Sequence, residues 1–222
     1  RVVHYFAYPA DMDRIMEIAR RHNLAVIEDV SHAQGGLYKG KKLGTFGDVA
    51  AMSMMSQKSF AAGELGMLVT DDHRIYERAM AYGHYERNNA NYITECDDLV
   101  PYYHIALGGV KGRANQLCTA LARVQLKYYD ERAMNYFWDR LEGLRGIRAI
   151  RVDESTGSNM AGWYCPHGAY HPEELHGLPV SRFCEAIRAE GFPSWDGGNF
   201  CLHTHRLFKD FDFYNEGVPS RI

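Results

Sequence analysis

The chain has 222 residues, and its 46% hydrophobic content is enough to bury one large core or two small ones. A net charge of −3 leaves no basic footprint for nucleic acid, and no apolar run approaches the roughly 18 to 20 residues of a membrane helix. Five widely spaced cysteines without a Cys-x-x-Cys pair predict reduced thiols, so we expect a cytoplasmic protein with neither a nucleic-acid nor a membrane partner.

The first half of the chain alternates between strand and helix patterns, which is typical of a mostly parallel sheet. We predict four strands in this half, at residues 2–6, 24–28, 49–54 and 67–70. Two helices are predicted between or after these strands, one from Asp11 to about Asn23 and one capped by Asp72. Residues 84–103 show no clear period and predict a long loop.

The second half predicts more helix and a smaller α+β unit. Helices are expected at residues 115–127, 131–144 and 181–190, the last of them closed by Gly191. The chain begins with Arg1 rather than Met, and its first strand pattern starts at once. We therefore expect it to be the C-terminal part of a longer protein.

An acid and a lysine follow two of the predicted strands. Asp29 ends the buried strand at 24–28, and Lys58 follows the strand at 49–54. In an α/β sheet such strand ends converge where ligands bind. Chemistry based on pyridoxal phosphate needs a lysine for a Schiff base and a carboxylate on the pyridinium nitrogen. Taken alone, a lysine after a strand is mostly a surface residue. The prediction of a cofactor site therefore depends on Asp29 and Lys58 occurring together.

Other motifs fit less well. Residues 35–42 nearly match a phosphate loop, but Lys42 stands where a Ser or Thr must bind magnesium. The chain has no G-x-G-x-x-G run, so a dinucleotide fold has no fingerprint. His203 and His205 suggest zinc, but without a Cys or carboxylate at a recognisable spacing we interpret them as ordinary histidines and predict no metal site.

Several runs of the chain resemble one enzyme family. They read I-E-D-V-S-H-A-Q-G-G at 27–36, Y-K-G-K-K-L-G-T-F-G-D-V-A-A-M-S-M-M-S-Q-K at 38–58 and G-E-L-G-M-L-V-T at 63–70, with further matches at 3–13, 109–117 and 201–208. In this order the runs resemble the DegT/DnrJ/EryC1/StrS aminotransferases. The resemblance implies an α/β protein of the fold-type I class that depends on pyridoxal phosphate. It divides the chain into a partial cofactor-binding large domain, 1–112, with a mostly parallel sheet, and a smaller α+β domain, 113–222.

The resemblance assigns a role to four residues. Lys58 forms the Schiff base and then moves the proton from the Cα of the amino donor. Asp29 holds the pyridinium nitrogen protonated, which keeps the ring an electron sink. His32 matches a position near the phenolic oxygen of the ring, although a structural histidine is the alternative. Ser53 matches a serine that contacts the cofactor phosphate.

Two positions depart from the family pattern. Leu65 stands in a turn where members often have glycine, and Lys111 replaces the asparagine that reaches the cofactor phosphate in the neighbouring subunit's site. A lysine contacts phosphate as a point charge, so we expect Lys111 to act in trans, which implies a homodimer. The family's N-terminal phosphate loop and its ring-stacking aromatic residue are absent from these 222 residues, so we expect an incomplete cofactor site.

These observations predict an aminotransferase that moves an amino group from glutamate or glutamine to a keto-sugar or keto-cyclitol. Arg87, Trp195 and His203 are the expected substrate contacts. Three alternatives remain. One is a sugar dehydratase, whose members in this family carry His in place of Lys58. The others are a catalytically silent regulator and a fragment that is inert by itself. The sequence does not separate a nucleotide-linked sugar from a free cyclitol, nor does it fix the stereochemistry of amination.

Overall fold

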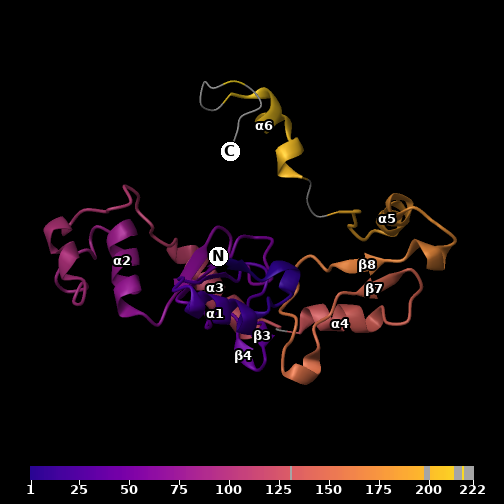
Figure 1. The fold of residues 1–222 in the computed structure, drawn as a ribbon, viewed down its shortest axis with the longest axis horizontal. Helices are drawn as coiled ribbons and strands as arrows, with labels where there is room; N and C mark the ends of the chain where they lie inside the picture. Colours follow the sequence, from indigo (N-terminus) through magenta and orange to yellow (C-terminus); the bar gives the residue numbers. More distant parts are fainter. Residues whose placement is uncertain (131, 198–200, 213–216, 218–222) are drawn as a thin grey trace. The chain divides into compact units, whose positions relative to one another are not determined.

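A computed structural model describes residues 1–130, 132–197, 201–212 and 217 (Figure 1). The chain forms two compact units. The first is Arg1–Gly143 with Arg148–Ala169, and the second is Leu144–Ile147 with Tyr170–Ile222. The predicted boundary between residues 112 and 113 lies inside the first unit, and the division into two family domains stays a prediction.

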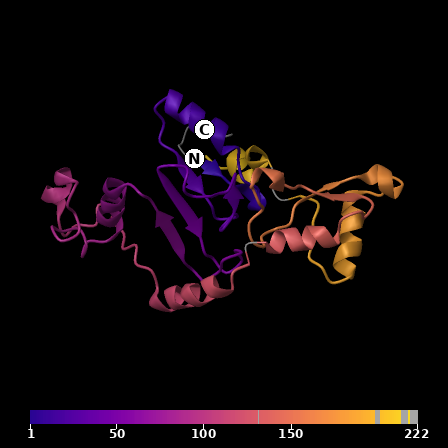
Figure 2. The same cartoon turned by 90° about the horizontal axis from the view of Figure 1, so that it is seen from below.

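The first unit contains a four-stranded sheet with the order β1-β2-β5-β6. Its strands are β1 (Val2–Val3), β2 (Ile27–Asp29), β5 (Val49–Ser53) and β6 (Gly66–Val69). The first three run parallel, whereas β6 pairs antiparallel with β5 (Figure 2). The predicted α/β class with a mostly parallel sheet is therefore confirmed.

The first predicted strand is too long. Strand β1 ends at Val3, and a 3₁₀ turn follows at Tyr5–Ala7. The cause is backbone geometry, because Phe6 (φ 49°) and Ala7 (φ 67°) both lie in the left-handed region, which cannot continue a strand.

Side-chain caps begin two of the helices where the sequence predicted them. Asp11 accepts from the backbone of Arg14 at the start of α1 (Met12–Arg21), and Asp72 does the same for Arg74 in α2 (His73–Gly83). The remaining helices are α3 (Gln116–Tyr128), α4 (Ala133–Arg140), α5 (Val180–Ala189) and α6 (Arg206–Asp210). Helix α4 is shorter than predicted. None of the helices in the described residues is long and apolar enough to cross a membrane.

Residues 35–42 form a hairpin rather than a phosphate loop. Strands β3 (Leu37–Tyr38) and β4 (Lys41–Lys42) pair antiparallel. Lys39 and Gly40 between them both have positive φ, 50° and 79°, as a two-residue hairpin turn requires. A second two-stranded sheet pairs β7 (Ile147–Ala149) with β8 (Gly168–Tyr170).

The predicted loop at 84–103 is ordered around a buried acid. It contains a 3₁₀ helix at Asp97–Tyr102, and its central part packs against α2. The fully buried carboxylate of Glu77 accepts from the backbone N–H groups of Thr94, Glu95 and Cys96 at 2.6–3.1 Å. Burial alone would raise the pKa of Glu77, but these hydrogen bonds outweigh it and lower the pKa to about 2. The charge of Glu77 therefore holds this segment to α2.

Candidate active site

Asp29 lies at the carboxyl edge of the sheet. It pairs in register with Ala51 of the parallel strand β5, so the ends of the two strands lie side by side. Its Oδ1 accepts from the backbone N–H of Ser31 at 3.1 Å, and its Oδ2 lies 3.5 Å from the guanidinium of Arg1. Burial raises the pKa of Asp29, but the hydrogen bonds from Ser31 and the charge of Arg1 lower it further than burial raises it. The side chain is therefore an anion at neutral pH.

Ser53 ends β5 beside this acid. Its backbone N–H donates to the hydroxyl of Ser31 at 3.0 Å, which ties the segment after β2 to the end of β5. Its own hydroxyl accepts from the backbone N–H of Met55 at 3.3 Å. The two serines therefore fix the edge at which both strands end.

A buried glutamine fixes the turn that carries Lys58. Gln34 is 4% exposed, and its amide donates to the carbonyl of Ser53 at 2.5 Å. Its amide oxygen accepts from the hydroxyl of Ser59 at 2.8 Å, directly after Lys58 in the chain. The backbone N–H of Lys58 donates to the carbonyl of Met55 at 2.9 Å. This turn is therefore anchored on both sides of the lysine.

The side chain of Lys58 lies against an aromatic ring that is far away in the sequence. Its Nζ donates to the hydroxyl of Tyr164 at 3.3 Å and lies 4.4 Å from the centre of the ring. The same ring lies 4.3 Å from the imidazole of His32. Burial lowers the pKa of His32, the charge of Lys58 lowers it further, and Asp29 opposes both. The structure thus brings Asp29, His32 and Lys58 within electrostatic reach of one another.

A stack of rings continues from His32. Phe6 lies nearly parallel to His32 at 5.8 Å between centres and nearly parallel to His167 at 4.7 Å. The backbone N–H of Phe6 also approaches Nδ1 of His32 at 3.5 Å. The left-handed bend at Phe6 therefore places an aromatic ring beside the cluster of His32, Lys58 and Tyr164. Backbone strain of this kind often marks a functional site.

The other predicted residues lie outside this cluster. The ammonium of Lys111 lies 4.7 Å from the ring of Tyr85, and the exposed guanidinium of Arg87 lies near the ring of Tyr92. Trp195 and His203 are exposed in the second unit. The roles of these four residues in cofactor or substrate binding stay predictions. For Lys111, the expected contact is with the cofactor site of a second subunit. Side chains of the C-terminal motif at positions 202 and 208 lie outside the described residues.

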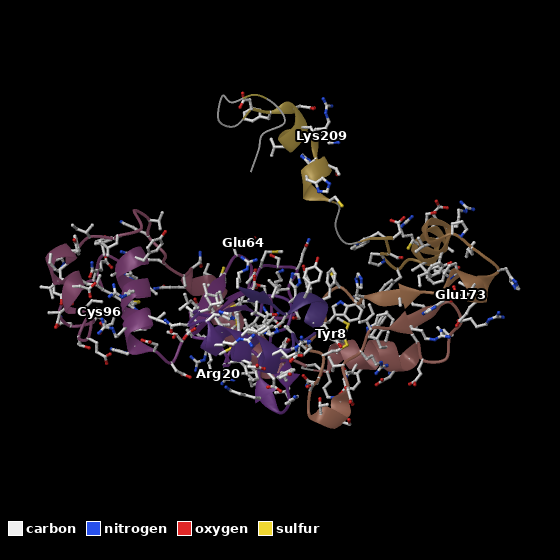
Figure 3. The ribbon with its side chains drawn as sticks, in the orientation of Figure 1. Tyr8, Arg20, Glu64, Cys96, Glu173 and Lys209 are labelled. Carbon is white, nitrogen blue, oxygen red and sulfur yellow. The ribbon has the colours of Figure 1, made fainter. Side chains whose placement is uncertain are left out.

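The sequence prediction missed Tyr164, Gln34 and Ser31. Gln34 and Ser31 belong to the run I-E-D-V-S-H-A-Q-G-G, so their nearness to Asp29 was a usable signal. Tyr164 had no such signal, because it lies 106 residues after Lys58 in a segment without a motif. The loop after Lys58 also holds Glu64, which is exposed and labelled in Figure 3.

Comparison with known proteins identifies the family. The DegT/DnrJ/EryC1/StrS aminotransferase family model matches residues 2–180. The chain belongs to this family. Aminotransferases of this family use pyridoxal 5′-phosphate. The family and fold predicted from the sequence motifs are therefore confirmed.

Three relatives illustrate the match. A GDP-perosamine synthase of Escherichia coli O157:H7 is 36% identical over 58% of this chain and 33% of its own length. A putative L-glutamine:3-amino-2,3-dideoxy-scyllo-inosose aminotransferase of Micromonospora echinospora is 32% identical over 92% of this chain and 48% of its own. An aminotransferase structure from Psychrobacter cryohalolentis has a TM-score of 0.73 at 24% identity and covers 98% of this chain and 58% of its own, which supports the fold. The chain thus spans about half or less of the length of the two curated relatives.

Proposed function

We propose that this chain carries the catalytic lysine of an aminotransferase that acts on a keto-sugar or keto-cyclitol. The observation that carries the proposal is the convergence of Asp29, His32 and Lys58 at one edge of the sheet. Asp29 is an anion there, and Lys58 is half-buried, with its amine ordered beside Tyr164. An anionic carboxylate and an ordered amine are the two protein groups that pyridoxal phosphate requires.

The residues present fit this cofactor. Asp29 has one oxygen bonded to Ser31 and the other facing the cation of Arg1, so it can take a positively charged N–H in place of that guanidinium. Ser53 ends β5 next to it and is our candidate for a phosphate contact, with Lys111 as a contact from the second subunit. When bound, the cofactor supplies an aldehyde and an electron-withdrawing ring.

The protein groups supply the proton chemistry. The amine of Lys58 is the group that accepts and returns the proton at Cα of the amino donor. The lowered pKa of His32 keeps its imidazole neutral at neutral pH, so it can donate one hydrogen bond without adding a second cation beside Lys58. The ring of Phe6 lies nearly parallel to that of His32, with 5.8 Å between the ring centres.

The names of the relatives suggest the reaction partners. We propose glutamine or glutamate as the donor, since relatives of 30–32% identity are described as using L-glutamine. Those relatives act on a cyclitol, whereas GDP-perosamine synthase makes a nucleotide-linked sugar, so both acceptor classes stay open. The presence of Lys58 argues against the dehydratase alternative. We also propose a cytoplasmic location, because the five cysteines are free.

The test is covalent capture of the cofactor. The purified chain is mixed with pyridoxal phosphate, reduced with borohydride and mapped by peptide mass spectrometry. We expect a pyridoxyl group on Lys58 and little on the exposed lysines Lys41 and Lys42, which serve as internal controls. Labelling spread evenly over all lysines would contradict the proposal. A Lys58→Ala variant that keeps its biological activity would favour the regulator.

The homodimer and the role of Lys111 have a separate test. Lys58→Met and Lys111→Met variants are each expected to be inactive. Mixed at equal amounts and allowed to exchange subunits, they should recover about a quarter of the wild-type activity, because half of the dimers then contain one intact site of two. A mixture without activity would mean that Lys111 does not act in trans.

A further inference from the structure

Tyr164 is the aromatic residue that contacts both Lys58 and His32. Its hydroxyl accepts from Lys58 Nζ at 3.3 Å, the ammonium lies 4.4 Å from the ring centre, and the ring lies 4.3 Å from the ring of His32. Within the described residues, its hydroxyl has no other hydrogen-bond partner. The ring is half-buried, so its position depends on the backbone segment that carries it.

The segment before Tyr164 is fastened to the sheet's unit by backbone contacts. The backbone N–H of Leu37 donates to the side chain of Asn159 at 2.7 Å, and the N–H of Asn159 donates back to the Leu37 carbonyl at 3.1 Å. Two residues later, the N–H of the fully buried Ala161 approaches the carbonyl of Ala7 at 3.4 Å. The segment therefore enters the site along a fixed path.

A third anchor joins this segment to the turn of Lys58. A Cβ at Gly162 would overlap the hydroxyl of Tyr129, so the backbone passes directly over that side chain. The same hydroxyl donates to the carbonyl of Gln34 at 2.5 Å, and Gln34 holds Ser59 beside Lys58. The elements that carry Tyr164 and Lys58 thus share one buried anchor.

We propose that Tyr164 is a positioning residue for Lys58. It holds the lysine nitrogen beside His32 through two contacts of different kinds. The face of the ring attracts the ammonium, and the phenol oxygen accepts one of its N–H bonds. A lysine on a flexible four-carbon stem would otherwise sample many positions. The inference rests on the proposed function of Lys58, because a positioned amine matters only if it reacts.

The two contacts can be separated by substitution. Tyr164→Phe keeps the ring face and removes the oxygen, whereas Tyr164→Leu removes both and keeps an apolar side chain. Tyr38→Phe is the matched control, because it removes a phenol that hydrogen-bonds to Asp11 at 2.9 Å elsewhere in the same unit. Circular dichroism and thermal unfolding of each variant establish that the fold is kept.

The measurement is the rate at which a trace of acetic anhydride modifies Lys58 at fixed pH, without cofactor, read by peptide mass spectrometry. The ring and the phenol oxygen of Tyr164 both lie against Nζ, so their loss should leave the amine more accessible and speed the reaction. We expect about a 2-fold increase for Tyr164→Phe and about a 5-fold or larger increase for Tyr164→Leu, with Tyr38→Phe unchanged. Lys41 and Lys42 in the same digest report general loosening of the fold.

The outcomes are distinct. An increase confined to Lys58, larger for the Leu than for the Phe variant, supports the inference. Unchanged labelling of Lys58, or an equal rise at Lys58, Lys41 and Lys42, would overturn it. Capture of pyridoxal phosphate on wild-type Lys58 is a separate readout, so its failure would remove the proposed function while leaving the contact between Tyr164 and Lys58 measured by the acetylation rates.

Discussion

Glu28, next to Asp29 on β2, is a buried carboxylate whose hydrogen bonds are all made within the protein. Its isosteric replacement by Gln measures how much the stability of the fold depends on them. The side chain is fully buried and accepts four hydrogen bonds. Its Oε1 accepts from the backbone N–H groups of Phe46 and Gly47, each at 2.7 Å. Its Oε2 accepts from Gly44 N–H at 2.8 Å and from Nε2 of the buried His4 at 3.1 Å.

The substitution Glu28→Gln leaves one oxygen and turns the other into an NH₂ donor. The oxygen can keep its two backbone partners, but the NH₂ then faces the N–H of Gly44 and the Nε2–H of His4. His4 cannot switch tautomer freely, because its Nδ1 already accepts from Ala10 N–H at 3.1 Å. Two buried donors lose their acceptor at about 1 to 3 kcal/mol each, so we expect a loss of about 2 to 6 kcal/mol. That is a large part of a typical unfolding free energy of about 5 to 15 kcal/mol.

The assay is urea unfolding followed by circular dichroism, with Glu17→Gln on the exposed face of α1 as the matched control. Although burial raises the pKa of Glu28, its hydrogen bonds lower it below the ordinary 4.5. The stabilisation is therefore present above about pH 4.5 and is lost as the pH falls through the lower folded pKa. Glu28→Gln should remove this pH dependence. A variant within about 1 kcal/mol of wild type, or one that keeps the wild-type acid sensitivity, would refute the reasoning.

Three further predictions test other parts of the first unit. Glu77→Gln should destabilise the chain by about 2 to 3 kcal/mol, because one carboxylate oxygen becomes an NH₂ group that cannot accept from the backbone N–H groups of Thr94, Glu95 or Cys96. The stability that Glu77 contributes to the wild type should fall between pH 4.5 and about 2, measured as urea midpoints at decreasing pH. Lys58→Met should raise the pKa of His32, because the charge of Lys58 lowers it; an unchanged histidine titration by NMR would show that the two groups are not coupled. Gly162→Ala should cost about 1 to 3 kcal/mol in urea unfolding, because its Cβ overlaps the Tyr129 hydroxyl, and a neutral result would mean that this close approach does not exist.

Local sequence signals were enough for the parts of the fold that depend on neighbours in the chain. Asp11 and Asp72 predicted two helix starts, because a capping side chain acts within three residues. The convergence of the strand ends at Asp29 and Lys58 followed from the parallel order of β2 and β5. These features can be predicted from the hydrophobic period of each element and from short local motifs.

The remaining features depend on contacts that no local pattern encodes. The left-handed backbone of Phe6 and Ala7 interrupts a run that otherwise has strand propensity, and its partners His32 and His167 come from distant segments. Tyr164 reaches Lys58 only because a segment more than a hundred residues later is anchored beside it. From sequence, that tyrosine is one of 15 in the chain, with nothing to distinguish it from the others.

Glu28 and Asp29 are neighbours on one strand, and we expect Glu28 to serve stability and Asp29 to serve ligand binding. Successive side chains of a strand point to opposite faces, so the two neighbours meet different surroundings. All the hydrogen bonds of Glu28 are made inside the protein, whereas Oδ2 of Asp29 faces Arg1, a cation that is 65% exposed. An exposed ion pair contributes about 0 to 1 kcal/mol, so Asp29→Asn should leave urea unfolding almost unchanged. It should nevertheless weaken the capture of pyridoxal phosphate on Lys58 by about 10- to 100-fold, the worth of one charged hydrogen bond. If Asp29→Asn unfolds the chain as Glu28→Gln does, the carboxylate of Asp29 belongs to the fold and is not available to a ligand.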